Sequence, residues 1–325
     1  MRWRLCGLFI LGLSTLLTAC GGGNSNSGTS SSSSSGTASN CPAATSSGSG
    51  GSASVSIGSK AFAEEQLLAE MTRQVLDAHG FNVTYTFQAA DKAIGTALQN
   101  GTIDMYWQYT GTELGTYLNL STGSYPTQLT QAFNFVKQKD APRGLCWYAP
   151  TPFNDTNAIA IKASDASTYG TSLAAFGQYL AANPSTKVCI MSEFRTRPDG
   201  LPGLESTYSW PSAGNYVDIQ NTAEKAIAGG QCVAGEVFST DSAIQANNEQ
   251  VLSDDKNLFP PDNAGLVIRS SVAQKYPLIA GLMTPVAQRL TTPTMLSLNA
   301  MVEIQNQKVS DVAHAWLVQN GFLSS

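Results

Sequence analysis

The amino-acid sequence predicts an α/β protein built as a two-lobed clamp, in which one lobe is inserted into the other. Short apolar segments typical of strands alternate with amphipathic segments typical of helices along most of the chain. The 325 residues are also more than one compact core of ordinary size holds. Two proline-containing crossings, near 150–156 and 254–264, interrupt the alternation and separate an outer part from an inner part. A chain that crosses twice between lobes has the layout of a hinge.

The first lobe is expected to comprise residues 55–150 and 264–325. It starts with strand, helix, strand, helix and strand, which predicts a mostly parallel sheet because parallel strands need long crossovers. Gly80 ends the first helix, and Pro277 and Pro293 suit first helical turns. The expected strands lie at 55–60, 81–87, 101–109 and 265–268, and the expected helices begin near 63 and 91 and cover 128–139, 277–289, 293–305 and 310–320.

The second lobe is expected to comprise residues 151–263 and again alternates strands with helices. Each lobe is therefore predicted to be a sheet flanked by helices. The expected strands lie at 157–161, 187–191, 216–219 and 232–238, and the expected helices lie near 173–182, 204–210 and 223–228.

The segment 101–114 joins a strand to a turn that contains Gly111 and two threonines, and a helix is expected over 114–118. Ligands of open α/β sheets bind outside the carboxyl ends of the strands. Trp107 and Tyr109 are therefore either aromatic residues near a ligand or ordinary core residues, and strand alternation favours a core position beside the site for Trp107.

The N-terminus has the features of a targeting segment. Arg2 and Arg4 precede a short apolar run, and Cys20 follows the sequence Leu-Thr-Ala, which resembles the lipobox of bacterial lipoproteins. We expect a signal peptide at 1–19, lipid attachment at Cys20 and a flexible Ser/Gly tether at 20–54. The alternative is an ordinary secretory signal followed by an unmodified cysteine.

Four cysteines remain in the exported body, an even number that suits an oxidising compartment. Cys189 and Cys232 each begin an apolar strand, so they can form a disulfide if those strands are neighbours. Cys41 and Cys146 would then join the tether to the body. A zinc site is the alternative, but the chain has no C-x-x-C and only two histidines.

Composition argues against several other functions. The net charge is -5 and no Lys or Arg cluster follows the N-terminus, which argues against nucleic-acid binding. No nucleophile elbow, H-E-x-x-H or Walker A motif is present, and His79 and His314 suit helix surfaces. We therefore expect that the protein is not an enzyme and has no cofactor or metal site. We also expect it to be a monomer.

Five motifs in order resemble the osmoprotectant-type substrate-binding proteins of ABC transporters, over about residues 54–322. This family binds glycine betaine, choline, carnitine and related compounds. The resemblance implies a type II periplasmic-binding-protein fold, a solute held between the lobes and ABC permease subunits as partners. The motifs lie at 57–66, 101–112, 194–200, 239–241 and 254–261.

The resemblance also implies a set of ligand-binding residues. Lys60, Thr112 and Arg197 match family residues that bind the ligand carboxylate, and Tyr109 and Phe238 match positions of an aromatic cage for the ammonium group. Without the resemblance, Lys60 and Arg197 would be assigned to surface salt bridges.

Two positions depart from the family pattern, because Asn157 and Asp262 stand where cage tyrosines are usual. Asp155 and Asp262 would offer hydrogen-bond acceptors to a cation, so a ligand with N–H groups, such as an amino-acid derivative, is expected as readily as betaine. The alternative is that the alignment shifts here and that Tyr208 or Tyr216 completes the cage. A further alternative is a sensory domain that reports ligand binding to a membrane protein, because such a domain would have the same sequence features.

Overall fold

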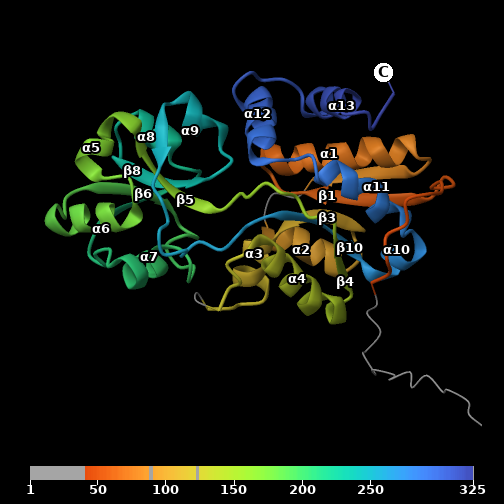
Figure 1. Ribbon diagram of the computed structural model, residues 1–325, viewed down its shortest axis with the longest axis horizontal. Coiled ribbons are helices and arrows are strands. Elements are labelled where there is room, and N and C mark those ends of the chain that lie inside the picture. The colour runs from red at the N-terminus through yellow and green to blue at the C-terminus, as the bar shows by residue number, and fades with distance from the viewer. Residues whose placement is uncertain (1–40, 88–90, 122–123, 325) are drawn as a thin grey trace, which may run out of the picture. The chain divides into compact units, whose positions relative to one another are not determined.

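The computed structural model describes residues 41–87, 91–121 and 124–324. The predictions for the signal peptide 1–19 and for Cys20 lie outside these residues. The described strands form two five-stranded sheets, which we call the first and the second lobe together with their helices (Figure 1). The first sheet has the order β2-β1-β3-β10-β4, with β1 (Ser54–Ser59), β2 (Asn82–Phe87), β3 (Met105–Tyr109), β4 (Leu145–Tyr148) and β10 (Ala264–Arg269).

The second sheet has the order β7-β6-β8-β5-β9. In each sheet three neighbouring strands are parallel, while the fourth runs antiparallel to both of its neighbours. That reversed strand is β10 in the first lobe and β5 in the second, and each follows a crossing directly. The strands of this sheet are β5 (Asn157–Lys162), β6 (Lys187–Met191), β7 (Asn215–Ile219), β8 (Ala234–Phe238) and β9 (Glu249–Val251).

Helices cover both faces of each sheet, which confirms the predicted fold class. In the first lobe, α1, α11, α12 and α13 lie on one face, and α2 and α4 lie on the other (Figure 1). Its helices are α1 (Ala63–Ala78), α2 (Asp91–Gln99), α3 (Thr110–Thr112), a π-helical turn (Glu113–Tyr117), α4 (Leu129–Asp140), α10 (Ser270–Lys275), α11 (Leu278–Ala287), α12 (Thr292–Glu303) and α13 (Val309–Gln319). The second lobe contains α5 (Ala166–Tyr169), α6 (Leu173–Ala182), α7 (Leu201–Tyr208), α8 (Glu224–Ala228) and α9 (Ser242–Ala246).

Several local predictions were wrong. Strand β3 begins at Met105 instead of residue 101, and α7 covers Leu201–Tyr208 instead of 204–210. The helix after β3 begins at Thr110 instead of Leu114, because the carboxylate of Asp262 accepts hydrogen bonds from the first backbone N–H groups of the expected turn. Strand β8 begins at Ala234 instead of Cys232.

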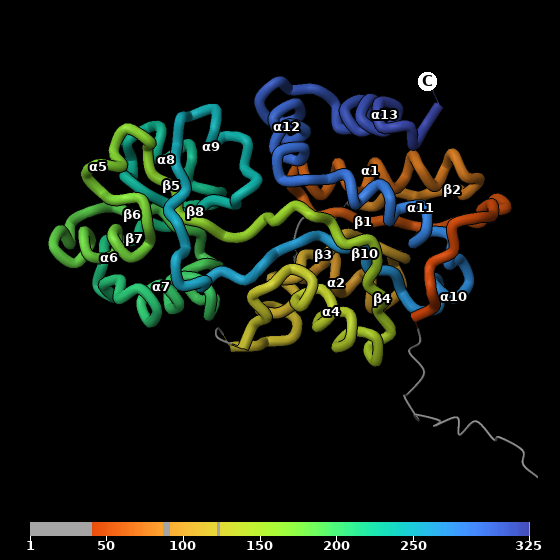
Figure 2. Tube along the Cα trace, viewed as in Figure 1, coloured from red at the N-terminus to blue at the C-terminus, as the bar shows by residue number. Residues whose placement is uncertain are grey.

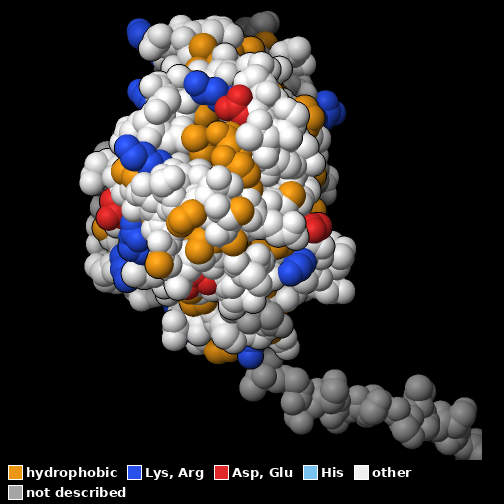
Figure 3. Space-filling model, turned by 90° about the vertical axis from the view of Figure 1, so that its left-hand side faces the viewer, with side chains coloured by type: hydrophobic (Ala, Val, Ile, Leu, Met, Phe, Trp, Pro, Cys, Tyr) orange, Lys and Arg blue, Asp and Glu red, His pale blue; other side chains and the backbone are white. Residues whose placement is uncertain are grey.

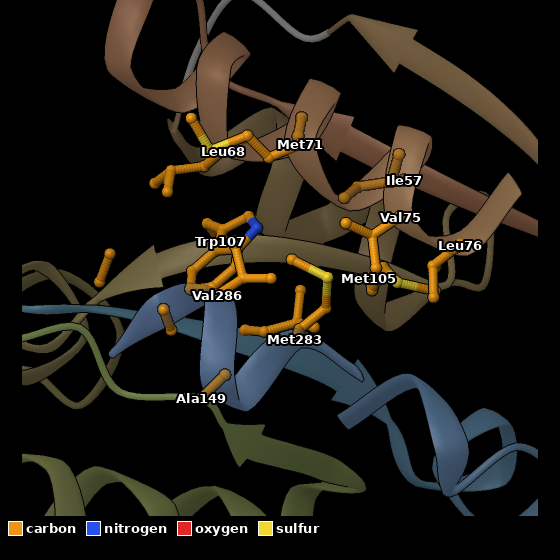
Figure 4. Packing of buried hydrophobic residues seen from close by; sticks show 14 of the residues in the cluster. Ile57, Leu68, Met71, Val75, Leu76, Met105, Trp107, Ala149, Met283 and Val286 are labelled. Carbon is orange, nitrogen blue, oxygen red and sulfur yellow. The ribbon is translucent and has the colours of Figure 1, made fainter. Parts of the chain in front are cut away.

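Trp107 belongs to the core, as strand alternation predicted. Its ring is fully buried between Leu68 and Met71 of α1 and Val286 of α11 (Figure 4). Its indole Nε1 donates to Thr72 Oγ1 at 2.9 Å, which satisfies its only polar group. The ring therefore packs between the first sheet and these helices, and it is not part of the wall of a binding site.

Both expected disulfides form. Cys189 of β6 bridges Cys232, which lies two residues before the parallel neighbour β8, with 5.8 Å between the Cα atoms. Cys41 bridges Cys146 of β4.

Residues 41–53 are not a free tether, which corrects the prediction for that part of 20–54. Besides the Cys41 disulfide, Gly50 N donates to His79 O at 2.8 Å and Ser52 N donates to Gly80 O at 2.7 Å. The Tyr148 hydroxyl donates to Pro42 O at 2.8 Å. These contacts hold a segment that has too little apolar surface to fold by itself.

The two crossings lie side by side (Figure 2). Thr151 N donates to Ala264 O and Asp155 N donates to Asp262 O, both at 2.9 Å. The amide of Asn263 also donates to two carbonyls of the first crossing. In register, Ala264 is opposite Tyr109 and Asn157 is opposite Phe238, so the carboxyl ends of β3 and β8 meet the crossings. Within the described residues, no helix combines the length and apolar character needed to span a bilayer.

Candidate functional site

The centre of the site is a buried hydrogen-bond network around Glu64, in the first turn of α1. The Tyr109 hydroxyl donates to Glu64 Oε1 at 2.6 Å. The Asn299 amide of α12 donates to Glu64 Oε2 at 3.0 Å and to Thr240 O of the second lobe at 3.2 Å. One carboxylate thus connects the end of β3, the start of α1 and, through Asn299, the opposite lobe.

Lys60 lies against the Tyr109 ring. It follows β1 directly, and its Nζ is 4.8 Å from the centroid of that ring, within the range of a cation–π interaction. The same Nζ donates to Gln108 Oε1 at 2.9 Å. The side chain is buried, so the strand end places a cation in a nonaqueous environment.

Asp155 lies in the first crossing and faces the Glu64 network. Thr240 Oγ1 donates to Asp155 Oδ1 at 2.5 Å. Burial and the neighbouring charge of Glu64 hold the pKa of Asp155 well above its usual value. Burial also raises the pKa of Glu64 to about 7, against the hydrogen bonds from Tyr109 and Asn299 that lower it. A nearby positive charge would stabilise the ionised form of both carboxyl groups and lower their pKa values.

Asp262, in the second crossing, binds the backbone at the end of β3. Gly111 N and Thr112 N donate to Asp262 Oδ1 at 2.5 and 3.2 Å. A Cβ atom on Gly111 would come within 2.8 Å of Asp262 Cγ, so glycine is required for this approach. Burial raises the pKa of Asp262 to about 7, although the charges of Arg197 and Lys60 lower it.

Arg197 belongs to a separate ion pair in the second lobe. Its Nε and Nη2 donate to the two carboxylate oxygens of Asp199 at 2.9 and 2.8 Å. This bidentate pair raises the pKa of Arg197 against the cost of burial. Arg197 lines a cavity of about 490 Å³ together with Lys92, Gly115 and Thr116.

A smaller cavity of about 220 Å³ adjoins the Glu64 network. Among the described residues, neither Lys nor Arg lines it. Two aromatic rings and several carboxyl groups from both lobes form its wall, an arrangement that favours a small organic cation. The wall includes Phe62, Phe238, Glu64, Asp155, Thr240 and Asn299.

The structure thus brings Lys60, Tyr109, Asp155 and Asp262 to one place. Thr112 takes part through its backbone N–H. Phe238 lines the smaller cavity, and Asn157 is buried opposite it in the register of the second sheet.

Tyr208 and Tyr216, which were the alternative cage residues, have other partners. The Tyr208 hydroxyl donates to Asp254, and the Tyr216 hydroxyl donates to Pro211 O at 2.8 Å. Both rings pack with the core of the second lobe.

The sequence analysis did not name Phe62, Glu64, Thr240 or Asn299 as site residues, although the first three lie in the motifs at 57–66 and 239–241. Glu64 carries no signal of its own in the sequence, because the helix dipole accounts for an acidic residue in a first helical turn without a binding site. Asn299 had a usable signal, because it follows Met295 by one helical turn and so lies on the buried face of α12.

Two sheets joined by two paired crossings, with an acidic and aromatic cavity that both lobes line, define a solute-binding protein of the periplasmic-binding-protein class. The chain belongs to the family described as the substrate-binding domain of the ABC-type glycine betaine transport system, whose model matches residues 53–319.

Relatives with established names agree with this assignment. The glycine-betaine-binding protein of Pseudomonas aeruginosa is 32% identical over 279 residues, which cover 83% of this chain and 89% of the relative. An ergothioneine transport permease/ergothioneine binding protein of Helicobacter pylori is 27% identical over 82% of this chain and 47% of its own length. Apo YehZ from Escherichia coli is a similar solved structure, with a TM-score of 0.65, 29% identity and coverage of 83% and 99%.

Proposed function

We propose that this chain is the extracytoplasmic solute-binding component of an osmoprotectant-type ABC importer, and that it captures a quaternary-ammonium or related solute of the glycine betaine and choline class. The cavity beside Glu64 is the observation that supports this most strongly. Its rings suit the methyl groups of such a cation, and its buried carboxyl groups attract the charge. The glycine-betaine-binding relative of Pseudomonas aeruginosa supports the same ligand class.

A cation that carries N–H donors is the second candidate. Glu64, Asp155 and Asn299 are acceptor groups on the cavity wall, and a fully methylated ammonium cannot donate to them. The Helicobacter pylori relative, named for ergothioneine, supports this wider range of ligands.

We also propose that lipid on Cys20 anchors the protein outside the cytoplasm and that ABC permease subunits receive the solute. The second lobe offers a surface for such a partner. Figure 3 views the body from the second lobe and shows apolar side chains gathered near the centre of that face, with charged side chains around them. Mass spectrometry of the protein purified from membranes would test the anchor, because lipid attached to Cys20 increases the mass of the N-terminal peptide.

Isothermal titration of the purified protein tests the proposed ligand class. The protein is first unfolded and refolded with its disulfides intact to remove bound solute, and is then titrated with glycine betaine, choline, carnitine, proline betaine and basic amino acids. We expect saturable binding of at least one quaternary-ammonium compound, with the compound recovered unchanged. Binding of none of these solutes, or conversion of any of them, would contradict the proposal.

A further inference from the structure

Asp262 uses the donors that could otherwise bind an anion. The two successive N–H groups after β3 already donate to its Oδ1, and the carboxylate is buried. The charges of Arg197 and Lys60 act on the same carboxylate. The backbone of Asp262 is fixed as well, because its N–H donates to Asn154 Oδ1 at 2.6 Å and its carbonyl accepts from Asp155 N at 2.9 Å. The protein thus supplies its own carboxylate at this point.

The charges around the site also favour a ligand with net positive charge. The carboxyl groups of Glu64, Asp155, Asp199 and Asp262 are all buried. The charge of Lys60 acts on Asp155 and Asp262, the charge of Arg197 also acts on Asp262, and Arg197 is ion-paired with Asp199. A zwitterion has no net charge and would leave the balance of charges around the site unchanged, whereas a cation would add a positive charge to offset these acids.

One acceptor on the cavity wall has no hydrogen-bond partner within the part of the chain that the structure describes. The Nδ2 of Asn299 donates to two acceptors, Glu64 Oε2 and Thr240 O, and this fixes the orientation of the amide. Its Oδ1 is buried and accepts no hydrogen bond from any described residue. Because Asn299 lines the smaller cavity, a ligand with an O–H or N–H donor can satisfy this oxygen.

We propose that Asp262 takes the position of a ligand carboxylate, and that the protein therefore selects organic cations bearing a hydroxyl or N–H donor over zwitterions such as glycine betaine. The inference rests on the proposed function, because it narrows the ligand class of the same site.

Choline and glycine betaine form the decisive pair, since they share the trimethylammonium group and differ in whether the arm ends in a hydroxyl or a carboxylate. By isothermal titration we expect the wild-type protein to bind choline at least about tenfold more tightly. Ethyltrimethylammonium, which lacks the donor, should bind more weakly than choline. A preference for glycine betaine would overturn this inference alone. Failure to bind any of the three would overturn it too, and the proposed function would fall with it only if carnitine, proline betaine and the basic amino acids also failed to bind.

Two variants distinguish the negative charge of Asp262 from its role as a hydrogen-bond acceptor for the backbone. Asp262→Ala frees the N–H groups of Gly111 and Thr112, so the preference should move toward glycine betaine by about tenfold or more. Asp262→Asn can keep an acceptor on those N–H groups while removing the charge, so its preference should lie between those of the wild type and of Asp262→Ala. Asp218→Asn, at an exposed acid paired with Arg195, is the matched control and should leave the preference unchanged. An equal change for both solutes in both Asp262 variants would overturn the inference.

Discussion

Glu64 shows how a single side chain can link ligand chemistry to the fold. Its carboxyl group is buried, accepts from Tyr109 and Asn299, and lies close enough to Asp155 for their charges to interact. Burial favours the neutral acid, whereas these two hydrogen bonds favour the carboxylate. The balance holds the group near the middle of its titration at neutral pH, where a bound cation would shift it toward the ionised form.

Tyr109→Phe tests this balance, because it keeps the ring and removes the hydroxyl. Loss of a donor to the carboxylate should raise the pKa of Glu64 further. We expect the affinity for the cationic ligand to fall about three- to tenfold at neutral pH, and the pH at which binding becomes half-maximal to rise. Titrations over a range of pH would measure both, with Tyr216→Phe in the second lobe as the control. Unchanged affinity and an unchanged pH profile would contradict the role given to the hydroxyl.

Among the elements, the paired crossings determine where the site forms. They place Asp155 and Asp262 beside the carboxyl ends of β8 and β3, and Asn263 fixes their spacing with two amide hydrogen bonds, to Thr151 O at 3.1 Å and to Phe153 O at 2.6 Å. The first crossing cannot shift along the second without breaking these bonds.

Asn263→Ala should therefore destabilise the protein. It leaves two buried carbonyl groups without their donor, for which we expect a loss of about 2 to 3 kcal/mol in the free energy of unfolding. Urea denaturation would measure this loss. Asn215→Ala is the matched control, because its exposed amide makes a single bond to Ser185 O and its removal should cost well under about 1 kcal/mol. Equal effects of the two substitutions would show that the crossings do not depend on Asn263.

The elements also show what the sequence could predict. Periodic segments such as α1 and β2 were predicted because their apolar spacing is local information. The early start of α3 was missed, since Gly111 marks a turn locally and its N–H is satisfied by Asp262, 151 positions away. Asn299 was missed for the same reason, because it reaches Glu64 across 235 positions.

At the scale of the whole molecule, several carboxyl groups are buried so deeply that the cost of burial outweighs the attraction of nearby cations, such as Arg143 beside Glu113. Burial raises the pKa of Glu113 and Glu236 to about 8 and those of Glu64 and Asp262 to about 7. In the unfolded chain these groups would titrate near their ordinary values. Between the two ranges the folded state therefore binds more protons than the unfolded state.

Stability should consequently decrease as the pH rises from about 5 to about 8, the reverse of a protein whose acids are ion-paired. The sign follows because the folded state takes up protons in this window, so raising the pH favours the unfolded state. We expect the free energy of unfolding by urea to be at least about 2 kcal/mol lower at the higher pH. Glu236→Gln should reduce the difference, and equal or greater stability at about pH 8 would contradict the expectation.

The Cys41–Cys146 bond has a mechanical consequence. It joins the segment before β1 covalently to β4, the strand from which the chain enters the first crossing. A pull on the chain ahead of Cys41 is thus transmitted through this bond to the opposite edge of the first sheet. Strand β1, which ends just before Lys60, lies outside that path of force, so tension on the N-terminal segment would not separate it from the sheet.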